Sequence, residues 1–177
     1  MPSWRPAGAG PPSTTCQQCR PRPDGVLRGK TSEEDFDHLV DVHLKGVFFV
    51  TQALLPRFAE GGAIVNVSSG LTRITAPGHA AYGAIKGAIE VLTRYQAKEL
   101  GGRSLRVNII APGATGTDFG GGSMMHSEQV RTRISSQVAL GRMGEPDDIG
   151  AALAALLSDA NRWVTAQRIE ISGGQSL

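Results

Sequence analysis

The hydrophobic positions that follow Thr31 recur mostly at helical spacing and predict one long helix that ends at the Gly61-Gly62 pair. Thr31 and Glu34 have the spacing of a capping box, and the acidic residues of the first turn suit the positive end of a helix dipole. The apolar positions of this helix are Phe36, Leu39, Val40, Val47, Phe48, Leu54, Leu55 and Phe58.

Three short segments further along the chain predict strands: the apolar run at residues 63–67, and the segments at 105–110 and 168–171. Between them, helices are expected at about 78–100 and 128–138, and a further helix opens at Pro146 with its apolar residues on one side. This alternation of helices and strands implies an α/β fold built on a parallel sheet with right-handed crossovers.

The first 30 residues have a different composition. Six of the ten prolines of the chain fall within residues 1–23, among arginines and glycines and with few aliphatic residues. Such a segment cannot bury enough apolar surface to order itself, so we expect a disordered tail at 1–30 before a domain at 31–177. The only cysteines, Cys16 and Cys19, form a lone CxxC in this tail, which supplies two ligands where a structural zinc usually needs four. We therefore expect no metal site.

Composition and charge narrow the functional class. The chain has 177 residues, 40% of them hydrophobic, which is enough for a buried core. Residues 1–30 carry five basic residues and one acidic residue, so the rest of the chain is slightly acidic despite the net charge of +2. Nucleic-acid binding is disfavoured, because it usually relies on an excess of basic residues in the folded domain. Neither a run of eighteen apolar residues nor the apolar stretch of a signal peptide is present, which makes a cytoplasmic location without membrane contact the expectation.

Tyr82 and Lys86 lie one helical turn apart in the second predicted helix, and this pair indicates proton transfer. A phenol with a pKa near ~10 is a poor acid or base at neutral pH, and a neighbouring ammonium favours its phenolate. Ser69, thirteen residues before Tyr82 at the end of a predicted strand, could hydrogen-bond the same substrate oxygen. Singly, these residues are more often a half-buried helix residue, a solvated charge and a turn former, so other motifs must support the chemistry.

Four motifs in order along residues 31–177 give that support. They are the strand end Asn66-Val67-Ser68-Ser69, the pair Tyr82-xxx-Lys86, the segment from Asn108 to Pro112-Gly113, and the sequence Gly-Arg-Met-Gly-Glu-Pro at 141–146. With these motifs at this spacing, the chain strongly resembles the short-chain dehydrogenase/reductases, which are NAD(P)-dependent oxidoreductases with a Rossmann-like parallel sheet flanked by helices. A serine hydrolase is disfavoured, because neither serine has the flanking glycines of GxSxG.

The resemblance implies a role for each matching residue. Ser69 would orient the carbonyl or alcohol of a small-molecule substrate, and Tyr82 would be the acid/base. Lys86 would lower the pKa of Tyr82, which for about 2–3 units requires roughly 3–4 kcal/mol, and would bind the nicotinamide ribose. The residues implied in binding NAD or NADP are Tyr82, Lys86, Pro112, Gly113, Thr115 and Thr117. The family also implies a homodimer or homotetramer, while Asn66 is expected to brace the sheet.

His43 is the first departure from the family pattern. It stands where the family usually has an asparagine that holds a proton-relay water against the catalytic lysine. An imidazole also donates and accepts hydrogen bonds, but it is bulkier and can become charged near neutral pH. The resemblance therefore implies a relay role for His43 in which an imidazole replaces the usual amide.

The second departure concerns the segment before Thr31. A family member is expected to have a strand, a TGxxxGxG phosphate loop and an NNAG segment there, and residues 1–30 contain none of them. Residues 115–122 match TGxxxGxG letter for letter, but they follow a later strand, which is the wrong place for a dinucleotide fingerprint. We therefore expect residues 31–177 to form a Rossmann domain truncated in its N-terminal half, with NAD(P) binding weakened or lost.

Three hypotheses follow. The first is an oxidoreductase of the short-chain type that transfers hydride between a nicotinamide and a carbonyl or alcohol. The second is a catalytically inactive fragment or pseudoenzyme that retains its surfaces for subunit association. The third is that residues 1–30 are not the native start of the protein, which the abrupt change in composition near Lys30 suggests. Neither the substrate nor the choice between NAD and NADP follows from the sequence.

Overall fold

The computed structural model describes residues 31–119 and 126–177. The predicted tail at 1–30, with Cys16 and Cys19, lies outside the described residues, as does the end of the letter match at 115–122.

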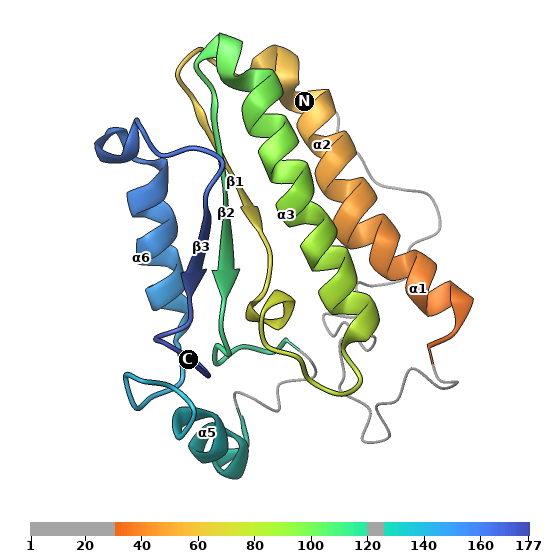
Figure 1. Ribbon diagram of the computed structural model, residues 1–177, viewed down its shortest axis with the longest axis vertical. Coiled ribbons are helices and arrows are strands. Elements are labelled where there is room, and N and C mark those ends of the chain that lie inside the picture. Colours follow the sequence, from red (N-terminus) through yellow and green to blue (C-terminus); the bar gives the residue numbers. More distant parts are fainter. Residues whose placement is uncertain (1–30, 120–125) are drawn as a thin grey trace, which may run out of the picture.

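Three parallel strands form a single sheet in the described part of the chain, in the order β1 (Ala63–Val67), β2 (Arg106–Pro112) and β3 (Arg168–Ile171). Ala63 pairs with Arg106 and Ile109 pairs with Arg168, which fixes the register of the two ladders. Because all strands run the same way, their carboxyl ends meet at one edge, which is the lower edge in Figure 1. The prediction of an α/β fold with a parallel sheet is confirmed.

Helices cover both faces of this sheet (Figure 1). The long helix α3 (Ala80–Leu100) lies on one face and α6 (Pro146–Leu157) on the other, while α1 (Glu33–Val40) and α2 (Gly46–Leu54) run beside α3. Helix α5 (Glu128–Ser135) lies beyond the carboxyl ends of the strands. Short 3-10 turns complete the elements: η3 (Leu55–Arg57), η4 (Gly70–Thr72), η5 (Gly101–Arg103) and η6 (Asp159–Asn161).

The core lies between α3 and the central strand β2. Ile89 of α3 and Val107 of β2 are fully buried. Asn66 of β1 is also buried, and its amide donates to Thr93 Oγ1 at 2.8 Å and Gln96 Oε1 at 2.9 Å, both on α3. These bonds satisfy a buried polar group and fasten the edge strand to the helix, as expected of a residue that braces the sheet.

The start of the first predicted helix differs from the prediction. Ser32, not Thr31, is the N-cap, and its Oγ accepts a hydrogen bond from the Asp35 amide at 3.0 Å. Ser32 has extended backbone angles directly before the first helical residue, so Thr31 lies one residue too early to cap.

The middle of the same helix contains a second difference. Between α1 and α2, the π-helical segment η2 (Asp41–Lys45) interrupts the α-helical hydrogen bonding. A π-helical turn accommodates an extra residue, which rotates the positions after it relative to those before it. The helix α2 that follows buries none of its residues within the described structure.

By length and composition alone, the continuous helical stretch Glu33–Arg57 could cross a membrane. Among the described residues it is the one helix with this length and composition. Length and composition alone are weak evidence for a membrane span, because core helices of soluble proteins have them too.

Candidate active site

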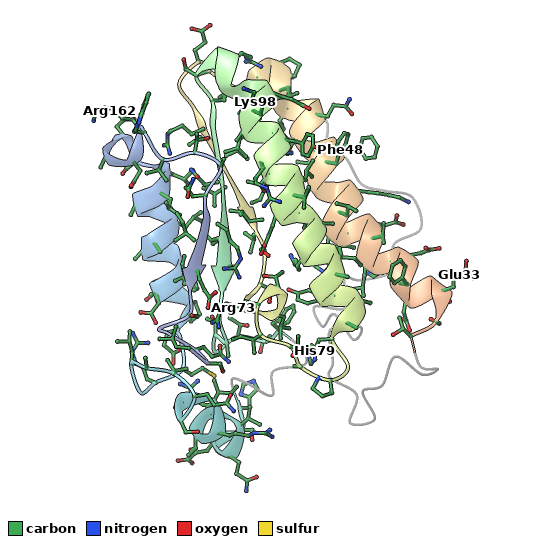
Figure 2. The ribbon with its side chains drawn as sticks, viewed as in Figure 1. Glu33, Phe48, Arg73, His79, Lys98 and Arg162 are labelled. Carbon is green, nitrogen blue, oxygen red and sulfur yellow. The ribbon has the colours of Figure 1, made fainter. Side chains whose placement is uncertain are left out.

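A cavity of about 760 Å³ lies at the carboxyl ends of β1 and β2, where ligands bind in open parallel sheets. It brings together every residue that the sequence predicts for catalysis or cofactor binding. These are His43, Ser69, Tyr82, Lys86, Pro112, Gly113, Thr115 and Thr117. Figure 2 shows His79, which also lines the cavity, at the same end of the molecule as Arg73 of the β1–α3 connection.

Tyr82 and Lys86 occupy the first part of α3, one turn apart, as predicted. The side chain of Lys86 is buried, with its Nζ 5.5 Å from the centre of the Tyr82 ring. The same Nζ donates a hydrogen bond to the carbonyl oxygen of Val67 at 3.0 Å. The last residue of β1 therefore anchors the ammonium close to the phenol.

Ser69 occupies the turn between β1 and η4. Its backbone is extended, and its Oγ accepts from the amide of Leu71 at 3.2 Å, which caps η4. Immediately before it, the amide of Ser68 donates to Ile110 of β2 at 2.7 Å and continues the pairing of the sheet. The serine hydroxyl is thus placed at the rim of the cavity by a strand end on one side and a short helical turn on the other.

His43 comes from η2 and contacts Tyr82 edge to face, with ring centres 5.4 Å apart and an interplanar angle of 88°. Burial, followed by the charges of Lys86 and His38, lowers the pKa of His43 to about 4. The charge that an imidazole can take up near neutral pH is therefore disfavoured at this position. A charged ring would lose hydration and face the Lys86 ammonium, so the folded protein holds His43 neutral.

The segment after β2 forms the other wall. A Cβ atom at Gly113 would lie 2.7 Å from the Cβ of Ser172, so only glycine fits where this backbone passes the C-terminal segment. The amide of Ala114 donates to Gln175 Oε1 at 2.9 Å. Thr115 forms an isolated parallel β-bridge with Gly144. Gly113 thus presents a fixed backbone to the cavity, and the hydroxyl groups of Thr115 and Thr117 line it beside that backbone, with the Thr115 hydroxyl donating to the carbonyl of Gly113 at 3.1 Å. Polar groups of this kind fit a nicotinamide nucleotide.

The remaining wall is mainly apolar. Phe119 lies 5.9 Å from the Tyr82 ring, centre to centre. The larger apolar side chains that line the cavity include Leu71, Ile74, Phe119, Val130, Ile134 and Ile149.

Sequence reasoning did not identify His79 and Gln175 as cavity residues. A signal existed for His79, because it precedes Tyr82 by three residues and caps the same helix. Gln175 follows the last strand near the end of the chain, where no periodic pattern marks it. Among the residues that the structure describes, no group of three or more histidine, cysteine or acidic side chains is arranged to hold a metal ion.

Comparison with known proteins agrees with this architecture. A family model described as enoyl-(acyl carrier protein) reductase matches residues 26–176. A 3-oxoacyl-[acyl-carrier-protein] reductase of Thermotoga maritima is 40% identical over 151 residues, which cover 84% of this chain and 60% of the relative.

Two solved structures show the same fold. The reductase LugOII, described as catalysing keto-reduction in lugdunomycin biosynthesis, superposes with a TM-score of 0.81 at 34% identity, covering 88% of this chain and 60% of that one. The angucycline C-6 ketoreductase LanV, solved with bound NADP, gives a TM-score of 0.77 at 37% identity, covering 83% and 56% of the two chains.

The chain spans less than two thirds of the length of the curated relatives it matches, 58% and 60% for the first two. Within that span, the family model, the sequence identity and the parallel sheet with its cavity all agree. The chain belongs to the short-chain dehydrogenase/reductase family of oxidoreductases.

Proposed function

We propose that this protein transfers hydride between a nicotinamide cofactor and a small carbonyl or alcohol substrate, with Tyr82 as the acid/base. The observation that supports this most is the convergence of Ser69, Tyr82, Lys86 and His43 on one cavity at the carboxyl ends of the strands. The NADP-bound ketoreductase among its structural relatives supports the same chemistry.

In the direction of reduction, the nicotinamide supplies the hydride to the carbonyl carbon when bound. Tyr82 gives its phenolic proton to the carbonyl oxygen, and Ser69 donates a hydrogen bond that holds this oxygen in place. The Lys86 ammonium, anchored by Val67, stabilises the phenolate that remains. In the direction of oxidation, the phenolate takes the alcohol proton.

His43 then serves as a neutral relay group. Its ring contacts Tyr82, and a neutral imidazole carries one donor and one acceptor nitrogen. A proton can be passed through such a ring without adding a second positive charge beside Lys86. This proposal gives His43 the place of the asparagine that the family usually has.

The apolar wall formed by Leu71, Ile74, Phe119 and their neighbours favours a carbonyl substrate with an apolar body. We place the protein in the cytoplasm as a homodimer or homotetramer, without nucleic-acid or membrane partners. The exposed apolar side chains of α2 support self-association.

We further propose that the 177-residue chain binds NAD(P)H weakly. The described residues line the cavity that the family resemblance implies for the nicotinamide, but no glycine-rich turn of the TGxxxGxG kind precedes β1 among them. Titration of NADPH followed by its own fluorescence should give a Kd weaker than about 100 μM, or about −5.5 kcal/mol. A micromolar Kd would contradict weakened binding.

The role of Tyr82 is tested by Tyr82→Phe, assayed at millimolar NADPH against a panel of aryl and alkyl ketones. Removing the phenolic proton donor proposed for the substrate oxygen should lower kcat by about 100-fold or more, while cofactor affinity stays within about twofold. Tyr95→Phe is a matched control, since Tyr95 is the only other tyrosine and is exposed. Turnover by Tyr82→Phe equal to that of the parent would remove Tyr82 from its role.

The alternative proposal is a catalytically inactive member that serves only in subunit association. The exposed α2 surface is the observation that favours it. Absence of turnover in the parent at millimolar cofactor, combined with a stable oligomer, would support this alternative over the enzyme.

A further inference from the structure

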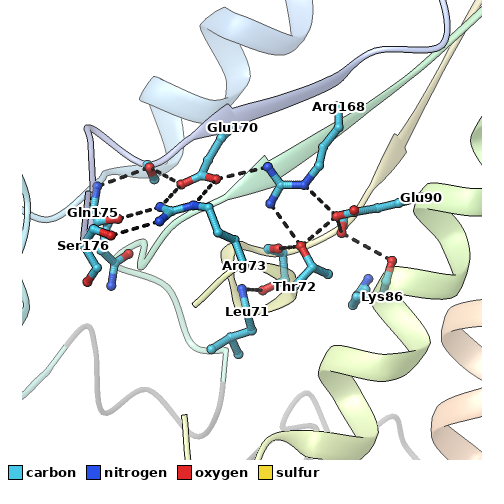
Figure 3. Close-up of polar contacts among 12 residues, drawn as sticks. Leu71, Thr72, Arg73, Lys86, Glu90, Arg168, Glu170, Gln175 and Ser176 are labelled. Atoms are coloured by element: carbon cyan, nitrogen blue, oxygen red, sulfur yellow. Dashed lines mark hydrogen bonds and ion pairs between the residues drawn. The ribbon is translucent and has the colours of Figure 1, made fainter. Parts of the chain in front are cut away.

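Glu90 belongs to the same face of α3 as the catalytic pair, two turns after Tyr82 and one turn after Lys86. Its side chain is 16% exposed and does not line the cavity. One of its carboxylate oxygens, Oε1, accepts three hydrogen bonds, from Ser68 Oγ at 2.6 Å, Thr72 Oγ1 at 2.7 Å and Arg168 Nε at 2.8 Å. Figure 3 shows the contacts of Glu90 with Thr72 and Arg168.

The two hydroxyl donors flank Ser69 along the chain. Each hydroxyl has a single proton, so its destination can be assigned from distance. Ser68 Oγ is 2.6 Å from Glu90 but 3.4 Å from the carbonyl oxygen of Lys86, which assigns its proton to Glu90. Thr72 Oγ1 is 2.7 Å from Glu90 and 2.9 Å from the carbonyl oxygen of Ser69, so its proton goes to the nearer carboxylate, with the serine carbonyl as the farther acceptor beside the same hydroxyl.

Arg168 completes the cluster from β3. Its Nη2 donates to Thr72 Oγ1 at 3.0 Å, which leaves the threonine proton directed at an acceptor, and its Nη1 donates to Glu170 at 3.0 Å. Burial raises the pKa of Glu90, but the bonds from Ser68, Thr72 and Arg168 outweigh this and lower the pKa overall. The carboxylate is therefore charged, and hydrogen bonds to a charged acceptor are stronger than neutral ones.

The cluster continues to the C-terminal segment. Glu170 also accepts from Arg73, whose guanidinium donates to the carbonyl oxygens of Gln175 and Ser176 at 2.7 and 2.9 Å. Gln175 lines the cavity and binds the amide of Ala114. One set of polar contacts thus runs from Glu90 and Thr72 through Arg168, Glu170 and Arg73 to Gln175, which lines the cavity (Figure 3).

We infer that Glu90 is a positioning residue, which through Ser68 and Thr72 fixes the turn that presents the Ser69 hydroxyl to the substrate. The inference rests on the proposed function for Ser69. A general structural role makes a different prediction, because a residue that only stabilises the fold would affect activity whether or not Ser69 has its hydroxyl.

A double-mutant cycle separates the two roles. Glu90→Gln should lower kcat/KM about tenfold in the parent, chiefly through kcat, with the Kd for NADPH unchanged. In a Ser69→Ala background the same change should cost less than about twofold, because the hydroxyl being positioned is already absent. Glu99→Gln, an exposed glutamate on the same helix, is the matched control and should leave kcat/KM unchanged in both backgrounds.

A second pair of variants covers the case in which Glu90→Gln fails to fold. Thr72→Val removes the hydroxyl with little change of shape and should lower kcat, whereas Thr72→Ser keeps the hydroxyl and should restore it. The positioning role would be overturned if Glu90→Gln lowered kcat/KM equally in the parent and in Ser69→Ala. Full activity in Thr72→Val would overturn it as well.

Hydrogen exchange distinguishes failure of this inference from failure of the proposed function. Glu90→Gln should increase exchange at the amides of Ser68, Arg73 and Ile74, which bond to Ile110 and Gly70 within or beside the turn, while Glu99→Gln should not. A parent protein without turnover would refute the proposed enzymatic function. The hydrogen-exchange measurement alone would then decide whether Glu90 fixes the turn. Unchanged exchange in Glu90→Gln would overturn the inference in either case.

Discussion

His43 illustrates at the scale of one residue how position changes chemistry. An exposed histidine titrates near pH 6.5, but this ring lies against Tyr82 with the Lys86 ammonium nearby. Withdrawal from water and the positive charge both act against protonation, so the neutral form is retained across the physiological range. The sequence identifies the unusual residue but not its charge, since the charge depends on neighbours brought together by folding.

The depressed pKa of His43 predicts a pH dependence of stability. Between pH 6.5 and about pH 4, the unfolded chain takes up a proton at His43 that the folded chain does not, so folding loses stability as the pH falls through this window. His43→Asn removes this contribution. Urea denaturation at pH 7 and pH 5 should show that the parent loses roughly 1–2 kcal/mol more of its free energy of unfolding than the variant does. Equal losses in the two proteins would contradict a depressed pKa.

At the scale of elements, the strands and the main helices follow from the sequence within a few residues. The run at 63–67 is short and mainly apolar, and the segment at 168–171 alternates charged residues with isoleucines; both are bounded by glycine or polar residues, and they are β1 and β3 in the structure. The spacing of apolar residues suffices to predict such elements, because burying one side of a regular backbone requires that spacing.

The features that the sequence did not predict depend on contacts between residues far apart along the chain or on a single hydrogen bond. The π-helical turn η2 changes hydrogen-bond partners without changing composition, and Ser32 displaces Thr31 as the cap by a shift of one residue. The site residues were found through the family resemblance and do line one cavity. The Glu90 cluster was not found, because Arg168 lies 78 residues from Glu90 and no periodic pattern connects them.

At the scale of the whole molecule, the most unusual surface is that of α2, because its large apolar side chains are exposed. Phe49 and Val50 are 59% and 58% exposed, and the Phe48 ring packs edge to face on Phe49 rather than into the core. A helix that is apolar on several sides is normally buried, so this surface favours association. A second copy of the chain is the partner that the family resemblance implies, and α3 beside it offers the exposed side chains of Val91 and Tyr95.

Self-association through α2 is tested by Phe49→Glu. A charge placed in an apolar interface has to be desolvated without a partner, which costs several kcal/mol and should shift the protein to a monomer in light scattering coupled to size exclusion. Gln52→Glu adds the same charge at an exposed polar position of the same helix and should leave the mass of the oligomer unchanged. A parent that is monomeric at micromolar concentration, or a Phe49→Glu oligomer of parental mass, would exclude α2 as the surface of association.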